Sequence, residues 1–232
     1  MAEIVEHDLP SFDMDSLAAC IRTWGKELGF DAIGIAGIDL GDAEAELSAW
    51  LAAGFHGEMD YMARHGTKRT RPAELVPGTV SVISARMNYW PETDNDKAEQ
   101  MLADGSRAYV SRYAHGRDYH KIMRSRLQKL ADRIRETVGD LGHRVFVDSA
   151  PVMEVALATK AGLGWRGKHT LLLNREAGSY FFLGEIYTDL SLRADKPISD
   201  HCGSCTRCID ICPTRAIVAP YEVDARRCIS YL

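Results

Sequence analysis

Four cysteines lie close together near the end of the chain. They are Cys202, Cys205, Cys208 and Cys212, separated by two, two and three residues, and Pro213 follows the last of them. Thiolates at this spacing are typical of bacterial proteins that bind 4Fe-4S clusters. In two-cluster modules the fourth cysteine of such a run binds a different cluster from the first three. The run therefore predicts iron-sulfur chemistry and electron transfer.

Other uses of these cysteines fit the sequence less well. Structural zinc prefers two separate Cys-x2-Cys pairs, which this evenly stepped run does not provide. A disulfide framework is disfavoured because Cys20 is the one cysteine that precedes the run. Cys228 adds a fifth thiol nearby, so the local thiols exceed the needs of one cluster and fall short of two. Cys20 itself falls on an apolar helical stripe with Leu17 and Ile21, where we expect a small buried thiol.

Composition limits the architecture and the location of the protein. A chain of 232 residues with 46% apolar and 26% charged residues can bury a sizeable core. We predict a catalytic domain over residues 1–195 and a small cysteine-bearing module over 196–232. The sequence contains no apolar run of about eighteen residues, and its acidic start resembles neither a signal peptide nor a transit peptide. We therefore expect a cytoplasmic protein with no membrane partner.

The charge balance argues against nucleic-acid binding through overall charge, because the formal net charge is -5. Local basic patches remain, one over residues 64–71 and one on the cysteine module, where Arg226 and Arg227 stand side by side. A solvated surface is the plainer interpretation of both patches.

Hydrophobic periodicity and turn residues predict a mixed sheet flanked by helices. A first helix is expected to be capped by Asp15 or Ser16 and to run to Gly29. Further helices are expected over 42–53, 119–138 and 151–161. The strands are expected at 31–38, 79–85, 107–111, 143–147, 169–174 and 179–187. We expect an ordered loop over 54–78 and a polar excursion over 94–106. The cysteine module has no room for an apolar core and should depend on its metal cluster.

Two short motifs suggest functions that their context does not support. Gly162, Gly164 and Gly167 match the dinucleotide pattern G-x-G-x-x-G. A dinucleotide fingerprint follows a strand and opens a helix, whereas here the order is reversed. The glycines more plausibly let the backbone approach something flat and bulky. Asp118 and His120 resemble the start of a cobalamin lower-ligand motif, but the rest of that motif is absent, so we expect His120 to be packed or exposed.

Seven blocks occur in a fixed order along the chain, at 68–72, 81–84, 112–120, 147–149, 161–168, 178–185 and the cysteine run. They include Arg-Tyr-Ala-His-Gly-Arg-Asp-Tyr-His at 112–120 and Gly-Ser-Tyr-Phe-Phe-Leu-Gly-Glu at 178–185. This series resembles the epoxyqueuosine reductase family over residues 17–232. The resemblance implies an α+β fold, with a nitroreductase-like mixed-sheet cobalamin-binding domain and a small ferredoxin-like iron-sulfur module. It also implies kinship with reductive dehalogenases.

The resemblance further implies a cytoplasmic, monomeric oxidoreductase that completes queuosine biosynthesis. It would reduce the epoxide of epoxyqueuosine to queuosine at the wobble position of tRNA, through reduced cobalamin fed by 4Fe-4S clusters. Its partners would be tRNA and a small redox protein or reductant that donates electrons. The cobalamin contacts implied are Arg69, Ser111, Arg112, Asp148, Gly167, Lys168, His169 and Leu172. Cys202, Cys205 and Cys208 would bind one cluster, Cys212 and Cys228 a second, and Arg226 and Arg227 would face tRNA.

Asp148 is implied by the resemblance as the proton donor, and its position leaves two interpretations. The pKa of an aspartate is normally about 3.9. To act as an acid at neutral pH, Asp148 would need a pKa about three higher, which corresponds to about 4 kcal/mol in favour of its neutral form. Burial against the corrin would supply that rise. Alternatively, Asp148 caps a helix that begins at Ser149 or Ala150, which would lower its pKa.

The chain departs from the family pattern at its end, because the family continues into another cysteine run and a helical region. We expect a truncated sequence, in which the first cluster has three of its four thiols and the second has two. Reductive dehalogenation of small molecules and a non-catalytic cobalamin or electron-carrier module are the competing functional hypotheses. Dehalogenases are usually exported, and this chain shows no twin-arginine leader.

Overall fold

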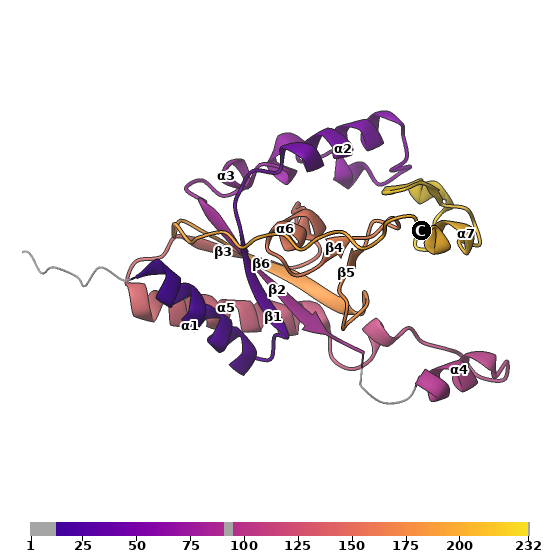
Figure 1. Cartoon of the computed structure of the whole chain (residues 1–232), viewed down its shortest axis with the longest axis horizontal. Helices are drawn as coiled ribbons and strands as arrows, with labels where there is room; N and C mark the ends of the chain where they lie inside the picture. The colour runs from indigo at the N-terminus through magenta and orange to yellow at the C-terminus, as the bar shows by residue number, and fades with distance from the viewer. Residues whose placement is uncertain (1–12, 91–94, 232) are drawn as a thin grey trace, which may run out of the picture.

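A four-stranded antiparallel sheet lies at the centre of the molecule (Figure 1). The computed structural model describes residues 13–90 and 95–231. The strands, in spatial order, are β1 (Ala32–Ala36), β2 (Ser81–Asn88), β6 (Phe181–Thr188) and β3 (His143–Phe146). All three pairs are antiparallel, so the sheet is not mixed as the sequence predicted. The direction of a strand is set by the connections between strands. Hydrophobic alternation within a strand gives no information on those connections.

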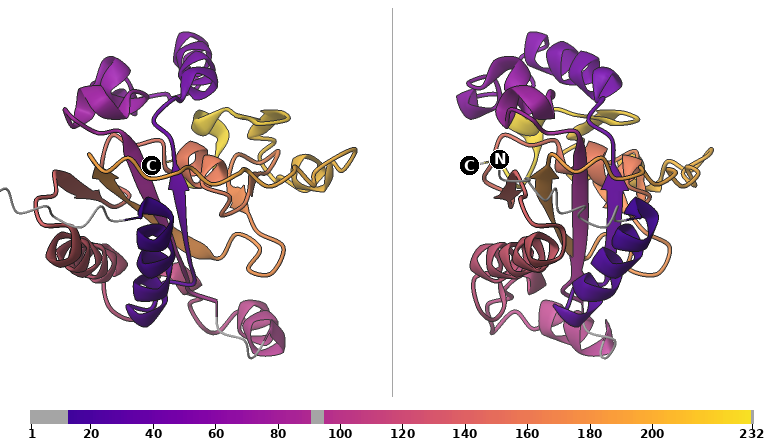
Figure 2. Two further views of the ribbon diagram at one scale, coloured as in Figure 1. Left: turned by 60° about the vertical axis from the view of Figure 1, so that its left-hand side comes forward. Right: turned by 90° about the vertical axis from the view of Figure 1, so that its left-hand side faces the viewer.

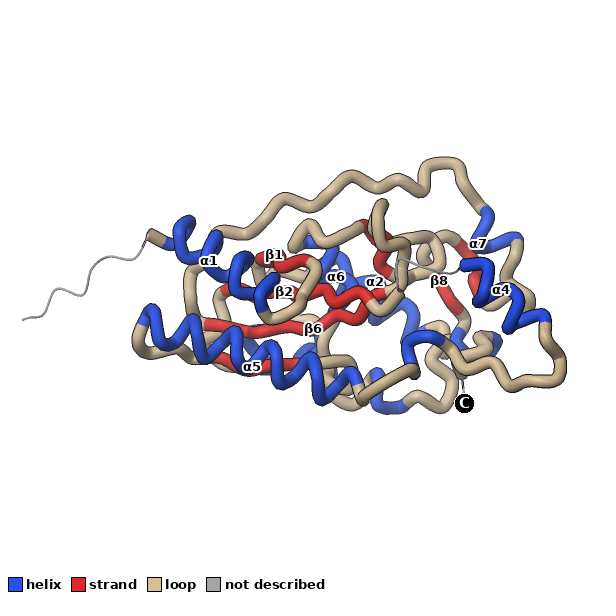
Figure 3. Tube along the Cα trace, turned by 90° about the horizontal axis from the view of Figure 1, so that it is seen from below, coloured by secondary structure: helices blue, strands red, loops and turns tan. Residues whose placement is uncertain are grey.

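Helices α1 (Met14–Glu27) and α5 (Tyr119–Val138) cover one face of the sheet (Figures 1 and 3). The long helix agrees with the sequence prediction, and its buried residues recur at helical spacing from Met123 to Ile134. The cap of α1 is Asp13, whose carboxylate accepts bonds from two backbone amides, rather than Asp15 or Ser16. Cys20 is exposed, contrary to expectation, because α1 buries Leu17, Ala18, Ile21 and Gly25 instead.

The opposite face packs against α6 (Glu154–Lys160) and a hairpin formed by β4 (Trp165–Arg166) and β5 (Leu172–Leu173). Helix α2 (Gly41–Ala52) lies beyond this layer (Figure 2). Helix α6 begins at Glu154 with Met153 as its N-cap, three residues later than the proline at 151 suggested. Asp148 therefore does not cap this helix.

Several predicted segments differ in the structure. The predicted strand at 107–111 is irregular and exposed, and it pairs with no strand in the part of the chain that the structure describes. The predicted loop at 54–78 contains η1 (Asp60–Met62), η2 (Gly66–Arg69) and the short α3 (Pro72–Leu75). The predicted excursion at 94–106 contains α4 (Asn95–Ala103), and η3 (Arg112–Ala114) follows it. Only β5 forms in the segment 169–174, as half of the hairpin.

The cysteine module follows an extended segment that runs back along β1 (Figure 3). The Asp195 carboxylate anchors this segment by accepting hydrogen bonds from Arg22, at 2.7 and 2.9 Å, and from the Ile35 amide, at 2.8 Å. The module contains α7 (Arg207–Asp210), β7 (Ile217–Ala219), β8 (Glu222–Val223) and η4 (Ala225–Arg227). Its buried residues among 196–231 are Ala216, Asp224 and Ala225, which agrees with the prediction that it lacks an apolar core of its own.

The described helices include none that is both long enough and apolar enough to cross a membrane.

Candidate active site

Asp148 lies just beyond the end of β3, where the chain turns sharply. Its backbone has a φ of 47°, in the left-handed region that aspartate tolerates better than most residues. The Tyr119 hydroxyl donates a hydrogen bond to the Asp148 carboxylate, and Nε2 of His120 lies 3.0 Å from the same oxygen. Tyr119 and His120 are the first residues of α5. The start of the long helix therefore fixes the position of the Asp148 side chain.

His120 bridges two carboxylates. Its Nδ1 lies 3.0 Å from Asp118, the N-cap of α5, while its Nε2 contacts Asp148. Ionised carboxylates only accept hydrogen bonds, so this geometry needs either a doubly protonated imidazole or a proton on one of the carboxyl groups. In both cases a proton lies between His120 and Asp148. The sequence analysis expected His120 to be packed or exposed, and it missed this role.

Glu154 supports Asp148 from the other side. Its Oε1 accepts a hydrogen bond of 2.7 Å from the Asp148 amide. Glu154 is half-buried and lines a small cavity beside Asp148. Burial, together with the charge of Asp148, raises the pKa of Glu154 to about 7, against the lowering effect of the bond from the Asp148 amide. Glu154 can therefore hold a proton near neutral pH.

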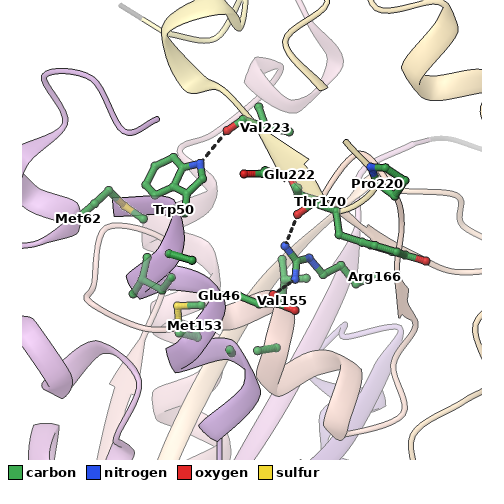
Figure 4. Close-up of a pocket in the computed structure, with 15 residues that line it drawn as sticks. Glu46, Trp50, Met62, Met153, Val155, Arg166, Thr170, Pro220, Glu222 and Val223 are labelled. Atoms are coloured by element: carbon green, nitrogen blue, oxygen red, sulfur yellow. Dashed lines mark hydrogen bonds and ion pairs between the residues drawn. The ribbon is translucent and has the colours of Figure 1, made fainter. Parts of the chain in front are cut away.

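Two cavities share the start of α6, and the smaller of them adjoins Asp148. The smaller one, of about 220 Å³, is lined by Tyr119, Asp148, Glu154, Val155, Leu171, Leu172, Ser179, Phe181, Phe182 and Leu183. Its wall is stiffened by the Tyr119 ring, which stacks on Phe182 with ring centres 3.8 Å apart. The larger cavity, of about 630 Å³, lies among α2, α6, the hairpin and β8 (Figure 4). Val155 lines both cavities, so they meet at the start of α6.

The larger cavity has mostly apolar walls crossed by a few polar contacts (Figure 4). Trp50 donates a hydrogen bond of 2.7 Å to the Val223 carbonyl, and Arg166 pairs with Glu46 and bonds to the Tyr221 carbonyl. Cofactor sites are commonly apolar clefts of about 300–1,000 Å³ with a few fixed polar groups. The adjoining cavities fit an organic cofactor placed beside Asp148.

Known proteins resemble both parts of the chain. Residues 69–149 match the family described as Epoxyqueuosine reductase QueG, DUF1730, and residues 201–232 match the 4Fe-4S double cluster binding domain. An epoxyqueuosine reductase from Alicycliphilus denitrificans is 63% identical over 91% of this chain, and one from Pseudomonas aeruginosa is 61% identical over 95%. The chain is similar to epoxyqueuosine reductases along nearly all of its length. It spans about 60% of the length of these curated relatives.

Solved structures agree with this assignment. An epoxyqueuosine reductase crystallised with an epoxyqueuosine-modified tRNA-Tyr stem loop superimposes with a TM-score of 0.80 at 30% identity, over 95% of this chain and 58% of that one. A reductive dehalogenase matches with a TM-score of 0.50 at 17% identity, over 84% of this chain and 22% of that one. This second match confirms the expected kinship of fold.

The cobalamin contacts implied for the reductase family lie in three places. Gly167, Lys168, His169 and Leu172 lie in the hairpin, and Leu172 also lines the smaller cavity. Arg69 is buried and donates hydrogen bonds to the carbonyls of Met62 and Tyr61, so it holds a loop whose Met62 lines the larger cavity. Ser111 is exposed, and the Arg112 guanidinium lies 5.0 Å from the ring centre of Trp90.

The glycine stretch at 162–167 has a local structural reason. A Cβ at Gly164 would lie 2.3 Å from the Leu173 carbonyl oxygen, and one at Gly167 would lie 2.7 Å from the His169 ring. Gly164 is therefore required by the backbone packing of the hairpin itself, whereas at Gly167 a Cβ would displace side-chain atoms of His169 and Leu173. The expectation that they admit something flat and bulky is not needed to explain them.

The hairpin joins the site to the cysteine run. Lys168 donates hydrogen bonds of 2.7 Å to the Gly203 carbonyl and 2.9 Å to the Cys205 carbonyl. Asp200 accepts a bond of 2.8 Å from the Cys202 amide and one of 2.7 Å from the Tyr221 hydroxyl. These bonds hold the first cysteines against residues 167–172, the segment next to the smaller cavity.

The cysteines differ in their surroundings. Hydrogen bonds from the Ile217 and Ala216 amides lower the pKa of Cys212 to about 7, which favours the thiolate that binds iron. Within residues 13–90 and 95–231, no three Cys, His, Asp or Glu side chains converge as ligands of a single metal ion. The corner ligands of a four-iron cluster lie farther apart than those of one ion. Cys202, Cys205 and Cys208 are the residues that would hold the cluster nearest the hairpin.

The two arginines expected to face tRNA differ from each other. Arg226 forms a two-pronged ion pair with the buried Asp224, at 2.8 and 2.9 Å, so its charge is largely committed within the protein. Arg227 is exposed. Arg227 is therefore the better placed of the two for a phosphate contact.

Proposed function

We propose that the protein that contains this chain reduces the epoxide of epoxyqueuosine to queuosine at the wobble position of tRNA. The protein would be an oxidoreductase that uses cobalamin and 4Fe-4S clusters, and its product would be queuosine in tRNA. The observation that supports this most strongly is the placement of Asp148 between a proton-sharing histidine and the smaller cavity, which is also lined by Leu172 of the hairpin to which Lys168 ties the cysteine run.

The reaction requires two electrons and two protons, and it releases water. Two C–O bonds of the epoxide break, a carbon–carbon double bond forms, and the oxygen leaves carrying both protons. Bound cobalamin would supply the electrons to the epoxide carbon. The chain's residues would supply the rest of the chemistry, beginning with a proton from Asp148 to the departing oxygen.

Several residues would prepare Asp148 for this step. Tyr119 and His120 fix the orientation of its carboxyl group, and His120 shares a proton with it. Positioned groups of this kind react faster because less freedom is lost on the way to the transition state. Cobalamin would be held by the apolar walls around Val155 and by the hairpin 167–172. Lys168 would keep the Cys205 loop close enough to pass electrons into the site.

We further propose a monomer that works in the cytoplasm, where tRNA is found, with a small redox protein or reductant as its electron donor. Residues 1–195 would form the cobalamin-binding domain and 196–232 part of the ferredoxin-like module. Arg227 would contribute a phosphate contact, whose strength should fall as salt is added.

The direct test is anaerobic reconstitution of the full-length protein. Iron and cobalt are counted per chain, and nucleosides from treated tRNA are analysed by mass. We expect bound cobalt, bound iron and a nucleoside that has lost one oxygen atom. Absence of cobalt binding, or unchanged epoxyqueuosine in the presence of both cofactors, would overturn the proposal.

A further inference from the structure

A row of aromatic rings leads away from the proposed acid along the end of the sheet. The Tyr119 ring stacks on Phe182, and the Phe182 ring centre lies 4.7 Å from that of Tyr89. The row continues from Tyr89 to Tyr180, at 6.1 Å, and from Tyr180 to Trp90, at 4.5 Å. Rings at these distances attract one another, so the row forms an ordered surface.

A third cavity, of about 790 Å³, opens at the far end of this row, where α4 lies (Figure 1). The residues that line it include Trp90, Tyr109 and Tyr180. Tyr180 lines this cavity, while Ser179 just before it lines the smaller cavity beside Asp148. The third cavity and the active site therefore adjoin the same short segment.

Hydrogen-bond acceptors also line the third cavity. The side-chain carbonyl oxygen of Asn88 is buried and has no hydrogen-bond partner among residues 13–90 and 95–231. Buried polar atoms are nearly always paired, so this oxygen is open to a donor from a ligand. Glu99 and Glu176 add exposed carboxylates. A nucleobase fits such a lining, because it has a flat face for stacking and N–H donors at its edge.

The segment that carries Tyr109 is exposed and basic. Arg107 and Arg117 are exposed, and the Arg112 guanidinium lies 5.0 Å from the centre of the last ring of the row. Arg107 pairs with Asp104 at 3.3 Å, but both side chains are exposed, so the pair is weak. Cations interleaved with aromatic rings are typical of surfaces that bind single-stranded nucleic acid.

We propose that the third cavity binds an unpaired base that neighbours the wobble base in the anticodon loop of tRNA. Tyr109 is 39% exposed and Tyr180 is 46% exposed, so both rings are accessible for stacking. The wobble base would lie at the smaller cavity beside Asp148, and phosphates of the loop would lie near Arg107 and Arg117. This inference rests on the proposed function, which supplies the tRNA.

The test measures RNA binding to the full-length protein without turnover. The probe is an anticodon stem loop that carries epoxyqueuosine, with no reductant present, and Kd is measured by fluorescence anisotropy. We expect Tyr109→Ala and Tyr180→Leu each to raise Kd at least about fivefold, the lower end of what one stacked base contributes. Tyr109→Phe is the matched control, because it keeps the ring, and it should keep the wild-type Kd.

A change in the RNA then identifies the base. An abasic nucleotide on either side of the wobble position removes one base and keeps the backbone. We expect one of these two RNAs to bind wild type more weakly and to bind Tyr109→Ala with no further loss, because both changes remove the same contact.

The outcomes separate this surface from the proposed function. Wild-type Kd for both ring variants, or losses from protein and RNA changes that add in full, would overturn the surface even if the protein reduces epoxyqueuosine. Binding that depends on the rings, in a protein that leaves epoxyqueuosine unchanged, would support the surface and contradict the proposed function.

Discussion

Nε2 of His120 lies 3.0 Å from the Asp148 carboxylate, and the two residues come from the start of α5 and the end of β3. The contact requires a shared proton, since an ionised carboxylate cannot donate to the ring. It therefore couples the charge of the histidine to that of the proposed acid. The stacked Tyr119 ring, with its centre 4.0 Å from that of His120, restricts the histidine further.

Replacing His120 should therefore slow the reaction without removing the cofactors. We expect His120→Asn to lower kcat by about 10–100-fold, because it removes a group that orients Asp148 and shares its proton. Lys121→Gln, on the next and exposed residue of α5, is the control and should keep normal kcat. Steady-state kinetics with metal analysis measure this. Equal rates for wild type and His120→Asn would show that the contact has no part in the reaction.

Lys168 should matter for the iron-sulfur cluster more than for the fold. Lys168→Met removes two charged hydrogen bonds to the cysteine loop; bonds of this kind contribute about 1.5–3 kcal/mol each, net of hydration, and less where solvent reaches them, as it does here. We expect less iron per chain after reconstitution and faster loss of iron to a chelator. Lys129→Met, an exposed change on α5, should behave like wild type. If the Lys168→Met protein retained iron as well as wild type, the proposed role of Lys168 in holding the cysteine loop would be contradicted.

Glu154 should make the stability of the protein depend on pH. Its pKa is raised from 4.5 to about 7 on folding, so between these values the folded state binds more protons than the unfolded state. The free energy of unfolding should therefore fall as the pH rises from about 4.5 to 7. The titratable groups coupled to Glu154 through charge are Asp148, His120, Tyr119, Glu185 and Tyr187.

Denaturant titrations at several pH values measure this effect. Glu154→Gln removes the titrating carboxyl group, so its free energy of unfolding should change less with pH across the same window. A wild-type stability that rises through this window, with Glu154→Gln following the same curve, would contradict the raised pKa.

The parts of the fold that could be predicted are those with strong local signals. The apolar spacing of α5 and the runs of β2 and β6 were recognisable because burial imposes a period on the residues. The predicted strand at 107–111 failed because strands need partners, which local alternation cannot supply. Cys20 was misjudged for a related reason, since its helix turns a slightly different face to the sheet.

The site was predicted only in part. The prediction of Asp148 rested on a family motif, and that of the cluster ligands on the cysteine spacing. Tyr119, His120 and Glu154 contact Asp148 only after the chain has folded. The Asp-Tyr-His sequence at the start of α5 was the available signal, since a capping aspartate places the next side chains at the helix end. Glu185 stands in the block at 178–185, but its burial gave no local signal, because a glutamate in an alternating strand is usually exposed.

The most direct test of the proposed mechanism is the rate at which the full-length Asp148→Asn protein converts epoxyqueuosine in tRNA, measured by mass under anaerobic, reducing conditions with iron and cobalt counted in the same sample. The amide keeps the shape of the side chain but has no proton to give. The mechanism predicts wild-type iron and cobalt contents with conversion at least about a hundredfold slower. Conversion at the wild-type rate by the cofactor-loaded variant would contradict the role of Asp148 as the acid.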